Sequence, residues 1–113
     1  MAKLRKYCGS YILEINNGTF REYCGSILYQ LDGDKVRRYC GNAIYQIDGN
    51  NIREYCGRCL LQVDGNYIRE YCGKILYQIE GDKIRQYCGG IIYQIDGFIS
   101  HRELMALIAI LFA

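Results

Sequence analysis

The chain contains no proline, has a small net charge and holds only one long apolar run. Without proline, nothing in the sequence interrupts the hydrogen-bond ladder of a β-sheet. The formal net charge of +2 creates no strong field for nucleic acid or an anionic membrane, so we expect neither as a partner. The apolar run, Leu104 to Ala113, has about half of the roughly 20 residues that a membrane-spanning helix needs.

The chain also lacks the usual marks of export and of enzymatic chemistry. Residues 1–6 are basic, but no apolar segment or small-residue cleavage site follows them, so we expect a cytoplasmic protein with reduced thiols. Phosphate loops, nucleophile elbows and dinucleotide-binding fingerprints are missing. The single histidine, His101, has no serine or cysteine nucleophile placed by the sequence to use it. We therefore predict no enzymatic activity and no cofactor.

What the chain has instead is a sixteen-residue repeat. The unit Arg-Glu-Tyr-Cys-Gly-Ser-Ile-Leu-Tyr-Gln-Leu-Asp-Gly-Asp-Lys-Val begins at Arg21, and a looser copy begins at Arg5. Each unit holds two turn signals, Cys-Gly and Asp-Gly or Glu-Gly, between short runs of β-branched and aromatic residues. This pattern predicts six β-hairpins over residues 3–99, with roughly twelve short strands in an antiparallel up-and-down meander. The unit restarts at Arg37, Arg53, Arg69 and Arg85.

Neighbouring hairpins must share one core, because a unit this short cannot bury its own apolar face. An open sheet of so many strands leaves two reactive edges and tends to curl. We therefore expect a mainly β fold in which the hairpins curl or close into a pseudo-symmetric ring. We treat residues 1–113 as a single repeat domain.

The faces of one hairpin follow if Glu80-Gly81 is its two-residue turn. Tyr77 then opposes Ile84, and both lie on the apolar core face. The opposite face is mixed, and on it we expect the Arg85 guanidinium to lie against the ring of Tyr87.

The repeat ends at Phe98, and residues 100–113 predict one short apolar α-helix. Ser100 and Glu103 have the spacing of a capping box. The helix is apolar on every side, so it must be buried on every side. We expect it to plug or lid the ring, or to be shared with a partner chain. Its predicted core or interface residues are Leu104, Leu107, Ile108, Leu111 and Phe112.

Tandem units of the type Tyr-Gln-Ile-Asp-Gly-x-x-Ile-Arg-x-Tyr-x-Gly resemble a known family. They are similar to small bacterial β-hairpin repeat proteins described as four-fold β-flowers, whose function is not established. The resemblance covers residues 5–97, and the short apolar tail is similar to tails of such chains. It implies a bacterial source and brings no catalytic residues. The six units of this chain depart from a four-fold plan.

Cysteine fills the same position in all six units, and Cys59 is one extra. Only Cys56 and Cys59 approach the pair spacing of a zinc site, and no second pair matches them. We therefore expect small buried thiols and no metal site, with a thiol metal site as a distant alternative. The acidic turns lack the alternating oxygen ligands of a calcium loop, so turn formation explains them. The repeated cysteines are Cys8, Cys24, Cys40, Cys56, Cys72 and Cys88.

The best binding candidate is a repeated Arg/Tyr face. Arginine forks recognise carboxylate and phosphate, and tyrosine offers flat contact area, which suggests a ligand-binding module for carbohydrate or an anionic partner. The other interpretation is a solvated face, with arginines paired to glutamates such as Glu22. The residues are Arg21, Arg37, Arg53, Arg69 and Arg85 with Tyr23, Tyr39, Tyr55, Tyr71 and Tyr87.

We favour the solvated face. The chain is then a protein of unknown function, a non-enzymatic structural or protein-interaction module. We expect it to form a homo-oligomer or to bind a protein partner through the apolar tail or the sheet.

Overall fold

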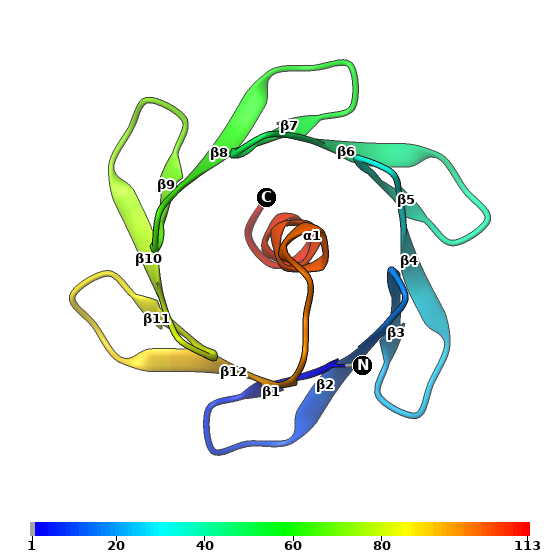
Figure 1. The fold of residues 1–113 in the computed structure, drawn as a ribbon, viewed down its shortest axis with the longest axis horizontal. Helices are drawn as coiled ribbons and strands as arrows, with labels where there is room; N and C mark the ends of the chain where they lie inside the picture. Colours follow the sequence, from blue (N-terminus) through cyan, green and yellow to red (C-terminus); the bar gives the residue numbers. More distant parts are fainter. Residues whose placement is uncertain (1) are drawn as a thin grey trace.

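The computed structural model describes residues 2–113 and shows twelve antiparallel strands that close into a ring around one helix (Figure 1). Strand β1 closes the ring by pairing with β12. This arrangement confirms the predicted class, a mainly β closed meander of hairpins with one short C-terminal helix. The elements are β1 (Ala2–Lys6), β2 (Tyr11–Asn16), β3 (Thr19–Glu22), β4 (Ile27–Asp32), β5 (Lys35–Arg38), β6 (Ala43–Asp48), β7 (Asn51–Glu54), β8 (Cys59–Asp64), β9 (Tyr67–Glu70), β10 (Ile75–Glu80), β11 (Lys83–Gln86), β12 (Ile91–Gly97) and α1 (His101–Phe112).

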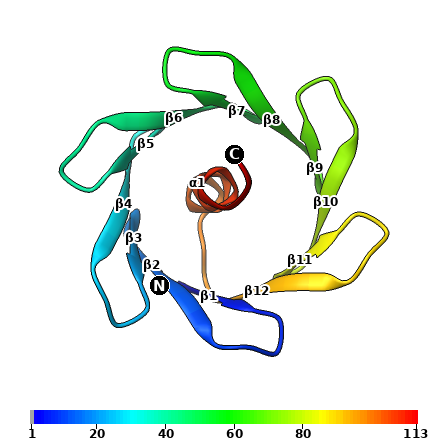
Figure 2. The same ribbon diagram turned by 180° about the vertical axis from the view of Figure 1, so that it is seen from behind.

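The molecule is a flat disk with extents of 36, 35 and 17 Å. The twelve strands form six hairpins that point outward from the ring, and we call them petals (Figures 1 and 2). Petals 1 to 6 are β1–β2, β3–β4, β5–β6, β7–β8, β9–β10 and β11–β12, each with a four-residue tip between its strands. Only two residues connect one petal to the next, such as residues 33–34 between β4 and β5.

The connections between petals differ by one residue from the predicted turn. Glu80 is the last paired residue of its strand, so the turn is Gly81-Asp82 and the prediction of Glu80-Gly81 is wrong. Gly81 has a φ of 63°, and this position of a tight hairpin favours glycine. Ile84 therefore faces Ile79, whereas the predicted turn placed Ile84 opposite Tyr77. The predicted core face survives this shift, because side chains alternate between the faces with a period of two.

One position of the repeat forms the inner wall of the ring. The next residue along each strand points outward, because successive strand residues alternate between the faces. The apolar position thus lies toward the axis, and the repeated arginine lies outside. The six inner residues are all fully buried: Leu4, Phe20, Val36, Ile52, Ile68 and Ile84.

Helix α1 lies in the centre of the ring (Figure 2). Its twelve residues rise about 18 Å, which matches the 17 Å thickness of the disk. Met105, Leu107 and Ile108 expose at most 1% of their surface, and burying each side chain is worth about 1.5–3 kcal/mol. The helix is therefore a plug within one chain, and it needs no partner chain to cover it.

The helix begins with the predicted capping box. The Ser100 hydroxyl accepts a hydrogen bond from the Glu103 N–H at 3.2 Å, and the Glu103 carboxylate accepts one from the Ser100 N–H at 3.1 Å. These bonds satisfy amides that the first helical turn leaves without partners.

Candidate functional site

The petal tips carry the Tyr-Cys-Gly sequence in a tight turn. In petal 2 the Gly25 N–H donates to the Glu22 carbonyl at 2.9 Å. Cys24, and not the glycine, takes the positive φ of 57°, and all six tip cysteines lie between 55° and 58°. Gly25 is required for a different reason, since a Cβ there would lie 2.9 Å from the Glu22 Cβ. The Cys-Gly turn signal is therefore correct, but the cysteine and not the glycine adopts the left-handed conformation.

The tip cysteines are exposed, so the prediction of small buried thiols is also wrong. All six lie at the outer ends of the petals, and Cys59, on β8, is partly buried. The prediction failed because a cysteine at the centre of an outward tip has no core to enter. Within residues 2–113, no group of three or more potential metal-ligating side chains comes together.

The tip tyrosines form a rim around the disk. Each tip tyrosine N–H donates to a carbonyl of the preceding petal at 3.0–3.3 Å, as Tyr39 does to Leu28. Leu28 is the extra residue of a β-bulge between β3 and β4, so the bulge frees its carbonyl for this bond. The rim tyrosines expose 41–50% of their surface: Tyr7, Tyr23, Tyr39, Tyr55, Tyr71 and Tyr87.

The repeated arginines clamp the petals. In petal 4, Arg53 donates from Nε at 3.1 Å and from Nη2 at 2.7 Å to the Gly57 carbonyl. Its Nη1 lies 3.9 Å from the Asp48 carboxylate, at the end of the preceding strand. The same pair of bonds joins Arg21 to Gly25, Arg37 to Gly41, Arg69 to Gly73 and Arg85 to Gly89.

In this clamp the arginine Nε and Nη2 groups already donate to glycine carbonyls, so they are not free to bind an anionic ligand. The cation–π contacts found among residues 2–113 involve Lys3 and Arg5, and the expected packing of Arg85 against Tyr87 is not among them. The structure thus separates the predicted Arg/Tyr face into an internal clamp and an exposed rim.

The predicted helix residues all pack against the core. Phe112 stacks on Tyr77 with ring centroids 4.0 Å apart, which anchors the C-terminal end of the plug. His101 and Arg102 are exposed in the first turn. Leu107 and Ile108 are fully buried, and the remaining residues are partly buried: Leu104, Leu111 and Phe112.

Glu103 joins the plug to the ring. Its Oε2 accepts a hydrogen bond from the Gly18 N–H at 2.8 Å, in the turn between β2 and β3. Partial burial acts to raise the pKa of Glu103, but the hydrogen bonds from Gly18 and Ser100 outweigh it and hold the pKa below its ordinary value. The carboxylate is therefore stabilised as the anion in the folded protein.

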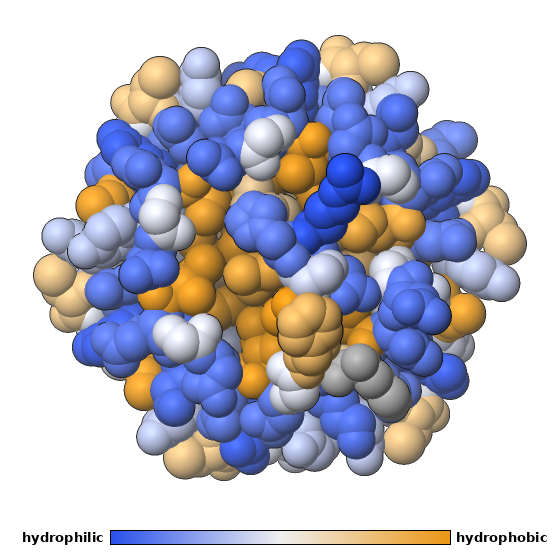
Figure 3. Space-filling view, in the orientation of Figure 1, coloured by the Kyte–Doolittle hydropathy of each residue, from blue (hydrophilic) through white to orange (hydrophobic). Residues whose placement is uncertain are grey.

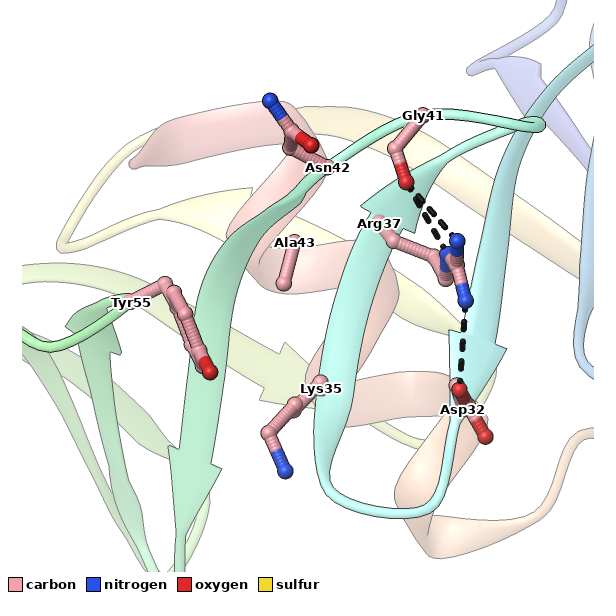
Figure 4. Close-up of a pocket in the computed structure, with 7 residues that line it drawn as sticks. All are labelled: Asp32, Lys35, Arg37, Gly41, Asn42, Ala43 and Tyr55. Atoms are coloured by element: carbon pink, nitrogen blue, oxygen red, sulfur yellow. Dashed lines mark hydrogen bonds and ion pairs between the residues drawn. The ribbon is translucent and has the colours of Figure 1, made fainter.

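A polar groove opens between petals 3 and 4. It has a volume of about 550 Å³, and we call it the Ala43 groove (Figure 4). Arg37 is held in its clamp at one side, bonded to Gly41 and paired with Asp32, while the Tyr55 ring lies at the other. The lining residues are Asp32, Lys35, Arg37, Gly41, Asn42, Ala43 and Tyr55.

One face of the disk is apolar near its centre. Figure 3 shows apolar side chains gathered there and polar side chains toward the edge. A pocket of about 240 Å³ is lined by four isoleucines, Phe98 and Leu104, together with two glycines, Asp82 and Lys83. Phe98, where the repeat ends, exposes 78% of its surface.

A family model described as the six-fold beta flower protein matches residues 15–113. The chain belongs to this family. The six-fold flower replaces the four-fold plan of the sequence resemblance, and the six petals and twelve strands agree with it. No curated protein matches the chain, and neither does any solved structure.

The family match places this six-fold flower among repeat proteins of unknown function, and the family is not a known enzyme family. No helix within residues 2–113 is long and apolar enough to cross a membrane. Sequence reasoning missed two features of the flower, the Glu103–Gly18 bond and the Ala43 groove. The only sequence signal for the groove was alanine at a position that holds larger side chains in the other units.

Proposed function

We propose that this six-fold flower is a non-enzymatic structural module that associates with further copies of itself through its tyrosine rim. The observation that supports this proposal is the regular set of six half-exposed tyrosines at the petal tips. Tyrosine is enriched at protein interfaces, because it offers a large contact area for little loss of conformational freedom.

The rigidity of the rim adds support. Each tip tyrosine is anchored by a backbone hydrogen bond to the neighbouring petal, so its main chain is already ordered before a contact forms. Preorganised side chains lose less entropy on binding. The helix is covered within one chain, so the proposal assigns association to the rim and not to the tail.

A carbohydrate or an anionic partner on the Arg/Tyr face is the second candidate. Its weakness is the clamp, since the arginine Nε and Nη2 groups already bond to glycine carbonyls. Its support is the Ala43 groove, which exposes Lys35 and Asn42 beside a tyrosine ring.

Sedimentation velocity over a wide protein concentration range tests the proposal. We expect concentration-dependent association of the natural chain and its loss in Tyr39→Ser/Tyr71→Ser, which removes the two most exposed rim tyrosines. Lys74→Ser, at the same tip as Tyr71, is the matched control and should associate like the natural chain. A natural chain that stays monomeric at every concentration contradicts the proposal.

A further inference from the structure

The six junctions between neighbouring petals are formed by equivalent repeat positions but do not hold equivalent residues. Ala43 occupies a position that carries a larger side chain in every other unit, namely Tyr11, Ile27, Cys59, Ile75 and Ile91. A small residue at this position leaves the Ala43 groove open.

Petal 1 shows what the same groove holds when it is filled. There Tyr11 replaces alanine, and its ring lies against Tyr23 with centroids 5.1 Å apart and planes inclined by 35°. The Lys3 Nζ lies 5.4 Å from the centroid of the Tyr11 ring and 5.6 Å from that of Tyr23. The Tyr11 hydroxyl donates to the Asp96 carboxylate at 3.0 Å. The phenol ring thus packs at a tilt against a second ring, lies beneath a cation and is hydrogen-bonded at its hydroxyl.

The Ala43 groove holds the same three residue types without the ring, and its Lys35 Nζ also lies 3.6 Å from the Asp34 carboxylate. Tyr55, Lys35 and Asp32 occupy the repeat positions of Tyr23, Lys3 and Asp96. The Tyr55 side chain is half-exposed, and the Asp32 side chain exposes 67% of its surface, so both are open to a ligand. Asp96 accepts the hydrogen bond from the Tyr11 hydroxyl while it is also paired with Arg5. The pairing of Asp32 with Arg37 therefore does not prevent Asp32 from accepting a hydrogen bond from a ligand hydroxyl.

A second tip tyrosine, Tyr87 of petal 6, contacts an aromatic ring of petal 5. Tyr67 replaces the lysine of this groove, and its ring meets Tyr87 edge-on with centroids 6.0 Å apart. Tip tyrosines therefore receive an aromatic ring in two petals, by two different geometries.

We propose that the Ala43 groove is a binding site for a phenol ring. The ring packs against Tyr55, lies beneath the Lys35 ammonium and donates its hydroxyl proton in a hydrogen bond to Asp32. Aromatic packing and cation–π attraction favour an aromatic ring, and the charge-assisted hydrogen bond favours a ring with a hydroxyl over a plain benzene ring. The groove volume of about 550 Å³ lies within the range of small-molecule sites. The proposal does not depend on association through the rim.

A titration with N-acetyltyrosinamide, followed by nuclear magnetic resonance, tests the site. We expect saturable shifts of the Ala43 methyl and Tyr55 ring signals. N-acetylphenylalaninamide lacks the hydroxyl and should bind about three- to tenfold more weakly, because one hydrogen bond to the Asp32 carboxylate is lost.

Two variants exchange the filled and open grooves. Ala43→Tyr should fill its own groove as Tyr11 does, and reduce binding at least tenfold, on the order of 1.4 kcal/mol, while the chain stays folded. Tyr11→Ala should open the petal 1 groove and raise the stoichiometry from about one to about two, because Lys3, Tyr23 and Asp96 remain. If Ala43→Tyr fails to fold, Lys35→Ala replaces it, with an expected weakening of binding. Thermal unfolding reports the folded state of each variant.

The same measurements identify the source of the ring. If the Ala43 and Tyr55 signals shift with added N-acetyltyrosinamide at a fixed, low protein concentration, the ring is a free or peptide-borne phenol. If the signals instead shift with protein concentration in the absence of ligand, and this shift is lost in Ala43→Tyr, the ring is a tyrosine of a second copy of the chain. The proposal is overturned if neither response reaches the Ala43 and Tyr55 signals, or if Ala43→Tyr binds the ligand as well as the natural chain does.

Discussion

The Arg53 guanidinium is fastened to the Gly57 carbonyl by two hydrogen bonds, of 3.1 Å from Nε and 2.7 Å from Nη2. The bonds join residues four apart across the tip of one petal. They fix the side chain of the repeated arginine and the direction of the tip at the same time. An arginine that sequence reasoning offered as a ligand-binding group is thus part of the scaffold.

Replacing two of these arginines with lysine should lower stability. Lysine cannot donate two fixed bonds to one carbonyl, so Arg53→Lys/Arg69→Lys should cost about 1 kcal/mol for each site. Thermal unfolding measures the loss. The control is Arg58→Lys, whose side chain is 84% exposed and should change stability by less than about 0.5 kcal/mol. Unchanged stability together with lost binding of a carbohydrate or anion would instead favour the ligand-binding module.

The tip cysteines should tolerate asparagine better than valine. Cys24 has a φ of 57°, a conformation that asparagine adopts readily and that β-branched residues resist. We expect Cys24→Val to lose about 1–2 kcal/mol of unfolding free energy and Cys24→Asn to lose less than about 0.5 kcal/mol. Chemical denaturation of both variants checks the difference, and equal losses would show that the backbone conformation is not the cause.

Thiol labelling should separate the cysteines into two classes. Six tip thiols are exposed and Cys59 is partly buried, so a thiol reagent should modify six sites rapidly in the folded protein. The seventh should react more slowly until the chain is unfolded. The count is followed by mass spectrometry, with Cys59→Ala as the control that removes the slow site. Slow reaction of all seven would mean that the tips are covered.

The plug should be indispensable to the fold. Leu107 is fully buried on the axis, so Leu107→Ala should cost about 2–5 kcal/mol. Deleting residues 101–113 should unfold or aggregate the protein, because the inner wall of the ring then faces water. Arg102→Ala, on the exposed first turn, is the matched control. A soluble, monomeric and fully folded truncation would show that the ring stands without its helix.

Stability should fall in acid partly through Glu103. Its pKa is lowered in the folded state, so the carboxylate contributes stability that is present above its unfolded pKa and is lost as pH falls through its folded pKa. Thermal unfolding between pH 7 and pH 2 should show a steeper decline for the natural chain than for Glu103→Gln. Parallel declines would mean that other carboxylates account for the acid sensitivity.

Local sequence signals predicted the hairpins, the capping box and the buried helix, because each depends on residues close together in the chain. The spacing of Ser100 and Glu103 sufficed for the helix start. The predicted turn, Glu80-Gly81, lies one residue before the actual turn, Gly81-Asp82, because both pairs combine glycine with an acidic residue. The exposure of Cys24 was missed because a repeated small residue suits a core and an outward tip equally.

The sequence by itself determined the repeat, the strand-forming runs and the need of an all-apolar segment for a core. The tertiary structure decided which face each side chain meets. Ring closure turns one strand position toward the axis and the next outward, which leaves the arginine to bond within its own petal. The same curvature brings Tyr55 of one petal beside Ala43 of another, and only that juxtaposition makes a groove. Contacts between petals follow from ring geometry, which no single repeat contains.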